Sequence, residues 1–142
     1  LASQGVNILH GVGARSALPE SKSGYKAVNY ISDMATAYLA ADLIIARSGA
    51  VTCAEVNTLG RYALFIPLPI GNGEQNLNAA SLISQGRAEI LPQALFTAEW
   101  MSQNLRRLLA QSSAAPISGS TIDIEATTKI VALMDYALSG GK

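Results

Sequence analysis

Short apolar runs alternate along this chain with longer segments of helical character, and this alternation constrains the fold more than any other feature. Five apolar runs are expected as strands, at residues 6–10, 27–31, 43–46, 63–68 and 88–91. Helices between strands carry the chain back to the start of the next strand, so the strands are expected to run parallel. The pattern therefore predicts an α/β, Rossmann-like parallel sheet with helices on both faces.

Capping residues and apolar spacing predict where the helices begin and end. Ser32 and Asp33 are expected to cap a helix over 34–42. A second helix is expected from about Thr52 to Leu59, and a third over 75–85, each stopped by a glycine. Thr97 is expected to cap a helix over 98–111, whose core face carries Met101, Leu105, Leu108 and Leu109.

Composition divides the chain into three parts. Residues 1–111 form the α/β domain, residues 112–120 (SSAAPISGS) are expected as a linker, and residues 121–142 as a terminal helix and tail. The sequence opens at Leu1, in a stretch that reads as a helix end entering a strand, so we expect a piece of a longer chain.

Charge and cysteine content exclude several classes of function. The formal net charge is zero and no basic run exists, so no nucleic-acid partner is expected. The longest apolar run, residues 63–70, contains two prolines and is too short to cross a bilayer. A single cysteine, Cys53, indicates a reducing, cytoplasmic setting without a disulfide. The acids, the histidine and the cysteine show no metal-ligand spacing, so neither a metal nor a cofactor is expected.

The stretch IIARSGAVTCAEV, residues 44–56, is the first candidate ligand loop. An apolar strand runs into small residues and then directly into a helix, which is how α/β proteins bring backbone N–H groups up to a phosphate. Gly49 lets a ligand approach the backbone and Ser48 offers a hydroxyl. The N–H groups of residues 50–53 are expected to point outward.

Two charged residues of this stretch have alternative interpretations. Thr52 and Glu55 fit a capping box, in which the acid bonds the backbone N–H of the cap. Alternatively, Glu55 accepts hydrogen bonds from two sugar hydroxyls. On spacing alone the capping box is favoured. Arg47 is expected either to bind a phosphate or to pair with a neighbouring acid.

The stretch PLPIGNGEQNLNA, residues 67–79, is the second candidate loop. Its prolines and glycines restrict the loop, and Gln75 and Asn76 then open a helix with amide groups suited to sugar hydroxyls. For Asn78, ordinary helix initiation is the favoured interpretation. Because both loops follow strands of one sheet, a nucleotide-sugar pocket is expected between them.

Residues 33–56 and 67–79 together resemble the carboxyl-terminal domain of the MurG family, and the wording PIGNGEQ is most similar to actinobacterial members. The family comprises bacterial glycosyltransferases that add N-acetylglucosamine to undecaprenyl-linked muramyl-pentapeptide in peptidoglycan synthesis. The resemblance covers roughly residues 5–110. It implies the carboxyl-terminal half of a two-domain GT-B enzyme, peripheral on the cytoplasmic face of the membrane.

The resemblance also implies roles for individual residues. Ile31 would provide backbone contacts to uracil, Glu55 would take the ribose hydroxyls in preference to a capping box, and Gln75 would contact the N-acetylglucosamine. No metal is implied, since helix dipoles and N–H groups stabilise the departing UDP. UDP-N-acetylglucosamine is thus expected to be bound by Ile31, Arg47, Ser48, Gly49, Ala50, Val51, Thr52, Glu55, Gln75 and Asn76.

Some family features are absent from this sequence. His10 is followed by Gly11 where the family has a glutamine, and Tyr62 stands where a proline is common. The lipid-linked acceptor is expected to bind an amino-terminal domain that this sequence lacks, together with the catalytic base. The family's first carboxyl-domain strand is also missing, so the strands at 6–10 and 43–46 are expected to pair directly or to leave a gap. A sheet without this strand is expected to be marginally stable.

Three hypotheses for the function follow. The first is the donor-binding part of the glycosyltransferase, catalytically silent alone because no catalytic residue lies in this sequence. The second is the donor-binding subunit of a two-chain glycosyltransferase. The third is a non-catalytic nucleotide-binding module on the same scaffold, because a fold does not dictate its chemistry.

Overall fold

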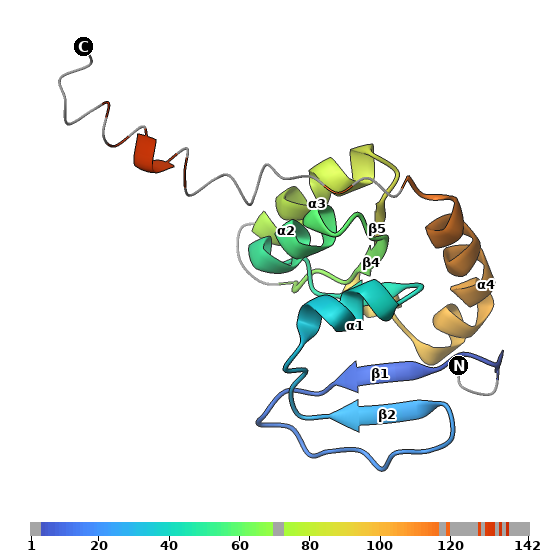
Figure 1. Cartoon of the computed structure of the whole chain (residues 1–142). Coiled ribbons are helices and arrows are strands. Elements are labelled where there is room, and N and C mark those ends of the chain that lie inside the picture. The colour runs from blue at the N-terminus through green and yellow to red at the C-terminus, as the bar shows by residue number, and fades with distance from the viewer. Residues whose placement is uncertain are drawn as a thin grey trace.

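The computed structural model describes residues 4–69, 73–116, 119, 128, 130–132, 134 and 136. Its described strands form two parallel sheets, one containing β1 and β2 and the other containing β3, β4 and β5 (Figure 1). The strands are β1 (Ile8–Gly11), β2 (Tyr25–Val28), β3 (Ile44–Ala46), β4 (Ala63–Phe65) and β5 (Ala88–Ile90). The helices are α1 (Met34–Ala40), α2 (Ala50–Thr58), α3 (Glu74–Ser84), the short 3-10 helix η2 (Gln93–Leu95) and α4 (Ala98–Ala114). The predicted α/β class and parallel pairing are confirmed.

The two sheets are not joined by strand pairing. β1 pairs with β2, with Ile8 opposite Tyr25, and β3 pairs with β4, with Ile44 opposite Ala63. Within the described residues, β1 and β3 each have a strand neighbour on one side only. Of the two arrangements expected from the sequence, the structure therefore has the gap.

Strand β4 lies between β3 and β5 and is covered on both faces. Because side chains alternate along a strand, Ala63 and Phe65 point to one face while Leu64 points to the other. All three are fully buried. A near-continuous apolar run is what a strand covered on both faces requires.

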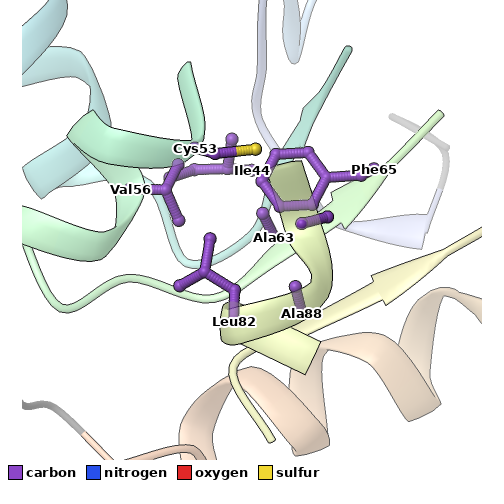
Figure 2. Packing of buried hydrophobic residues seen from close by; sticks show 8 residues of the cluster. Ile44, Cys53, Val56, Ala63, Phe65, Leu82 and Ala88 are labelled. Atoms are coloured by element: carbon purple, nitrogen blue, oxygen red, sulfur yellow. The ribbon is translucent and has the colours of Figure 1, made fainter. Parts of the chain in front are cut away.

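The two faces of the larger sheet are covered by different helices. On one face, Cys53 and Val56 of α2 and Leu82 of α3 form one buried cluster with Phe65 and other side chains of the sheet (Figure 2). On the other face, the apolar side of α4 packs on the sheet through Met101, Leu105 and Leu108, with Leu109 partly buried beside them. The face predicted for this helix is therefore confirmed.

Glycines end α2 and α3 by the same motif. Gly60 (φ 66°) and Gly86 (φ 68°) adopt the left-handed conformation that follows a helix end. In each case the next residue donates its N–H back to the last helical turn, Arg61 to the Val56 carbonyl at 3.1 Å and Arg87 to the Leu82 carbonyl at 2.8 Å. The stops predicted from these glycines are confirmed.

The predicted N-caps of α1 and α4 are also present. The Asp33 carboxylate accepts a hydrogen bond from the Thr36 N–H at 3.0 Å, and the Thr97 hydroxyl accepts one from the Trp100 N–H at 3.0 Å. Each satisfies one of the backbone donors that a helix start leaves unpaired.

Several predicted boundaries differ from the structure. Helix α2 begins at Ala50 rather than Thr52, because the backbone already turns helical after Gly49. β2 lies earlier than predicted, and α4 continues to Ala114, into the segment assigned to a linker. The terminal helix predicted within residues 121–142 lies largely outside the described residues, although those described between 128 and 136 are helical.

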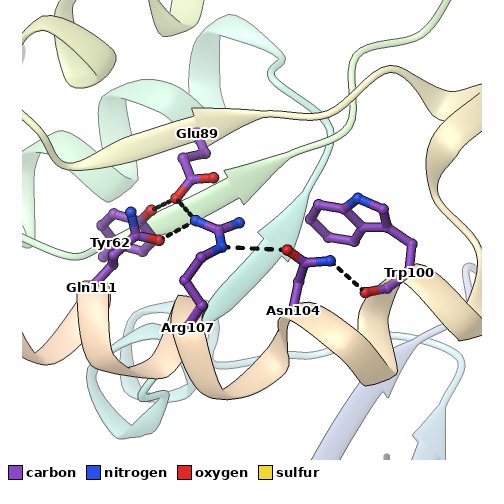
Figure 3. A network of polar contacts seen from close by, with 6 residues as sticks. All are labelled: Tyr62, Glu89, Trp100, Asn104, Arg107 and Gln111. Atoms are coloured by element: carbon purple, nitrogen blue, oxygen red, sulfur yellow. Dashed lines mark hydrogen bonds and ion pairs between the residues drawn. The ribbon is translucent and has the colours of Figure 1, made fainter.

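A polar network fastens α4 to β5 (Figure 3). Glu89 of β5 accepts hydrogen bonds from the Tyr62 hydroxyl at 2.6 Å and from Arg107 of α4 at 2.8 Å. Burial opposes ionisation of Glu89, but these two donors outweigh it, so the pKa of Glu89 lies below its usual value. The pKa of Tyr62 is raised, first by burial of its hydroxyl and then by the hydrogen bond that the hydroxyl donates to Glu89.

Arg87 is a buried cation that joins the ends of α2 and α3. Its side chain is 1% exposed. The guanidinium donates to the Val56 and Asn57 carbonyls, both at 3.1 Å, and to the side-chain oxygens of Asn57 and Gln85. The carbonyl end of a helix attracts a cation, so Arg87 stabilises the last turn of α2. Burial lowers the pKa of Arg87.

Candidate functional site

The β3–α2 junction presents backbone N–H groups without a side-chain cap. Gly49 is the N-cap, with φ −64° and ψ 151°, and it has no side chain to accept from the first turn. Its carbonyl accepts a hydrogen bond from the Cys53 N–H at 2.9 Å. The expectation that Cys53 offers a free N–H group is therefore wrong. The N–H groups of Ala50, Val51 and Thr52 have no acceptor within the described residues. An added Cβ at Gly49 would meet nothing within 4 Å, so the space in front of this turn is open.

Ser48 was expected to offer its hydroxyl to a ligand, but the hydroxyl does not lie at the surface. The residue is fully buried, and its hydroxyl oxygen has no hydrogen-bond partner among the described residues. Ser48 takes part through its backbone, since its carbonyl accepts a hydrogen bond from another element.

Arg47 contacts backbone carbonyls. It donates to the carbonyls of Ile66 and Pro67 at 2.9 and 3.2 Å, which ties the β3–α2 junction to the loop after β4. Of the two partners weighed for it from the sequence, an acid is not among these contacts, and a phosphate stays a prediction.

Glu55 is not part of a capping box, because α2 begins at Ala50 and Thr52 already lies inside its first turn. The half-exposed carboxylate of Glu55 lies beside the Tyr38 hydroxyl of α1, which also contacts Thr52. Burial raises the pKa of Tyr38, and the negative charge of Glu55 raises it further. Tyr38 of α1 therefore lies close to Glu55, which stands near the middle of α2, and no local spacing in the sequence predicts this proximity.

The start of α3, like that of α2, has a glycine as its N-cap, although the two glycines differ in backbone conformation. Gly73, with φ 79°, is the N-cap and offers no side-chain acceptor. The Gln75 side-chain oxygen accepts the Leu68 N–H at 2.9 Å, which anchors the residues that follow β4. This bond leaves the Gln75 amide nitrogen available to donate, and Asn76 beside it is exposed.

Asn78 joins the two junctions directly. Its side-chain nitrogen donates to the Ser48 carbonyl at 3.0 Å. The sequence favoured ordinary helix initiation for Asn78, and the structure gives it a bond between elements instead. Its spacing of three from Gln75 places both amides on one face of α3, which is the signal that could have found it.

Ile31 lies at the smaller sheet. Its side chain packs on Gly11 at the end of β1, where an added Cβ would meet the Ile31 Cδ1 at 3.4 Å. Nearby on the same sheet, His10 Nδ1 lies 2.8 Å from the Tyr25 hydroxyl. Ile31 is thus the predicted site residue carried by a different part of the fold from the β3–α2 and β4–α3 junctions.

Two surface hollows lie elsewhere. One, of about 290 Å³, is bounded by Tyr62, Glu89 and the end of α4. The other, of about 360 Å³, lies along β2 beside Lys22 and Lys26. Neither is lined by a predicted site residue. Among the described residues, no group of three metal-binding side chains gathers and no helix is long and apolar enough to cross a membrane.

Parallel strands covered by helices on both faces, with glycine-capped helices following β3 and β4, define a Rossmann-like α/β lobe. The glycosyltransferase family 28 C-terminal domain matches residues 1–132, and the chain belongs to this family. The resemblance found in residues 33–56 and 67–79 is confirmed.

The most similar curated relatives include two corynebacterial proteins, each called UDP-N-acetylglucosamine–N-acetylmuramyl-(pentapeptide) pyrophosphoryl-undecaprenol N-acetylglucosamine transferase. That of Corynebacterium efficiens is 44% identical over 109 residues, covering 77% of this chain and 30% of the relative. That of Corynebacterium glutamicum strain R is 50% identical over 99 residues, covering 70% of this chain and 28% of the relative. The chain thus spans under a third of the length of these relatives.

A solved structure supports the same assignment. The crystal structure of Acinetobacter baumannii MurG superimposes with a TM-score of 0.55 at 39% identity. The match covers 62% of this chain and 27% of that one. The predicted Rossmann-like, GT-B-related fold is therefore confirmed.

Proposed function

We propose that this chain binds the UDP-N-acetylglucosamine donor of a glycosyltransferase acting in peptidoglycan synthesis. The observation that carries the proposal is the pair of glycine-capped helix starts that follow β3 and β4. The carboxyl ends of parallel strands meet at one edge of a sheet, where α/β proteins bind nucleotides. The names of the corynebacterial relatives support this choice of donor.

The β3–α2 junction suits the diphosphate. The N–H groups of Ala50, Val51 and Thr52 are available to a charged oxygen, with Gly49 leaving room in front of them. Each hydrogen bond to a charged oxygen contributes about 1.5–3 kcal/mol, and the helix end adds about 0.3–2 kcal/mol. The departing UDP is stabilised by the same groups.

The remaining predicted residues suit the uncharged parts of the donor. Glu55, with the Tyr38 hydroxyl close by, takes the ribose hydroxyls. The Gln75 amide nitrogen and Asn76 face the sugar hydroxyls, and the backbone at Ile31 contacts uracil. Arg47 orders the site from behind, through its bonds to the Ile66 and Pro67 carbonyls.

In the complete enzyme, the C4 hydroxyl of the undecaprenyl-diphosphate-linked N-acetylmuramyl-pentapeptide attacks the anomeric carbon with inversion. A base outside this chain takes the proton. The full-length protein acts at the cytoplasmic face of the membrane, with the acceptor held by another domain. The chain alone is expected to transfer no sugar.

Titration of the chain with UDP and ADP, followed by isothermal calorimetry or amide NMR shifts, tests donor binding. We expect a preference for UDP, with a dissociation constant of about 1 mM, or about −4 kcal/mol. Equal binding of the two nucleotides would favour a general nucleotide-binding module, and binding of neither would refute the proposal. Sugar transfer by the chain alone would contradict the assignment of the base to another domain.

A further inference from the structure

Three side chains connect the two candidate loops in a closed arrangement. Arg47 reaches from the β3–α2 junction to the Ile66 and Pro67 carbonyls beyond β4. Gln75 of α3 holds the N–H of Leu68 in the same β4 loop, and Asn78 of α3 holds the Ser48 carbonyl. The bonds from α3 come from one face of the helix, since Gln75 and Asn78 are three residues apart. The β3–α2 junction, the β4 loop and α3 are thus each bonded to the other two.

Asn78 occupies the most consequential position in this arrangement. The Ser48 carbonyl belongs to the same planar peptide unit as the Gly49 N–H, and the two point in opposite directions across a trans peptide. A side chain that holds this carbonyl therefore fixes the direction of the Gly49 N–H and the entry into α2. The N–H groups of Ala50, Val51 and Thr52, which have no acceptor among the described residues, follow immediately.

The local environment makes this bond structurally significant. It joins residues 30 apart in the sequence, and it is partly buried. Ser48 itself is fully buried, so water does not readily replace Asn78 at its carbonyl. The Ser48 hydroxyl has no hydrogen-bond partner among the described residues. Ser48 is therefore hydrogen-bonded to α3 through its carbonyl, which accepts from Asn78.

We propose that Asn78 is a positioning residue for the diphosphate of the nucleotide. It touches no part of the donor, and acts by orienting the first-turn N–H groups of α2 through the Ser48–Gly49 peptide. This inference rests on the proposed function, because it assigns those N–H groups to the diphosphate of UDP.

Two variants of Asn78 test the inference in the whole 142-residue chain. Asn78→Asp keeps the shape but replaces the donor with a carboxylate that repels the Ser48 carbonyl. Asn78→Ala removes the group and favours the helix. Ala80→Asp is the matched control, since it adds the same charge at an exposed position of α3 that makes none of these bonds.

UDP is titrated into each ¹⁵N-labelled protein and amide shifts are followed. We expect about fivefold weaker UDP binding in both Asn78 variants, the value of one ordinary hydrogen bond. The UDP-induced shifts of residues 49–52 should shrink, while the uracil-induced shift at Ile31 and the dispersion of the spectrum are kept. A general loss of stability would not produce this selective change. Ala80→Asp should bind UDP like the parent chain.

Each other outcome is decisive. If the parent chain binds no UDP, the proposed function fails and this inference with it. If the parent binds and both Asn78 variants bind equally well with unchanged shifts, the inference alone is overturned. Unfolding of both variants would also overturn it, because it would give Asn78 a role in the core rather than in the junction.

Discussion

Replacing Arg87 is the sharpest test of how the α2–α3 layer is held together. Arg87→Ala removes four hydrogen bonds from a charged donor to the end of α2 and to Gln85. Such bonds contribute about 1.5–3 kcal/mol each. These bonds are opposed by the cost of removing the guanidinium from water, which is several kcal/mol and is not offset by a carboxylate among the acceptors. The Val56 and Asn57 carbonyls also keep backbone donors, from Arg61 and Gly60, so neither is left unpaired.

The balance predicts that Arg87→Ala lowers the free energy of unfolding by about 2–4 kcal/mol. Urea unfolding followed by circular dichroism and by the fluorescence of the single tryptophan, Trp100, measures it. Arg106→Ala is the control, since Arg106 is exposed on α4. It should change stability by less than about 0.5 kcal/mol.

A second variant and a salt titration keep this prediction testable if Arg87→Ala does not fold. If Arg87→Ala does not fold, Arg87→Met keeps most of the buried volume and isolates the loss of the hydrogen bonds. The cost should be nearly independent of salt, because a buried cation is little screened. A loss below about 1 kcal/mol for either variant would refute the role assigned to Arg87 at the end of α2.

Three more predictions follow from contacts described above. Gly49→Ala should leave the chain folded, since a Cβ there meets nothing within 4 Å. The added methyl group should nevertheless hinder the approach of the diphosphate to the N–H groups and weaken UDP binding about tenfold, as measured by calorimetry. Unaltered affinity would contradict the proposed site. Thr97→Ala should cost about 1 kcal/mol in urea unfolding, and a neutral result would contradict the observed cap of α4. The pKa of Glu89 lies below its ordinary value in the folded state. The free energy that Glu89 adds to folding is therefore present at neutral pH, and it is lost as the pH falls from the ordinary value through the folded one. Glu89→Gln should therefore flatten the stability profile over that acidic range, and an unchanged profile would refute this assignment.

Much of the fold could be predicted because its signals are local. Apolar runs, the glycines that end α2 and α3, and the caps Asp33 and Thr97 each act within a few residues of where they stand. The start of α2 was misplaced for the same reason. Thr52 and Glu55 have the spacing of a capping box, which favoured a start at Thr52. The residues that actually precede the helix, Ser48 and Gly49, show no capping-box spacing and no apolar periodicity.

The contacts that organise the candidate site could not be read from spacing. Asn78 meets Ser48, and Arg87 meets Asn57, across 30 residues of sequence in each case. Such pairs depend on how neighbouring α/β units pack, which local patterns do not specify. Arg47 shows the same limit, because its charge suggested a phosphate or an acid and did not indicate its bonds to the Ile66 and Pro67 carbonyls.

The sheet arrangement also sets how backbone amides exchange with deuterated water. Amides of β4 lie between two paired neighbours under helices on both faces, so they should exchange only when the whole larger sheet opens. Those of β1 and β2 belong to a two-stranded ribbon and should exchange through much smaller openings, well before β4. The chain should therefore lose protection in two stages, with the amides of β1 and β2 exchanged while those of β4 still keep their protons.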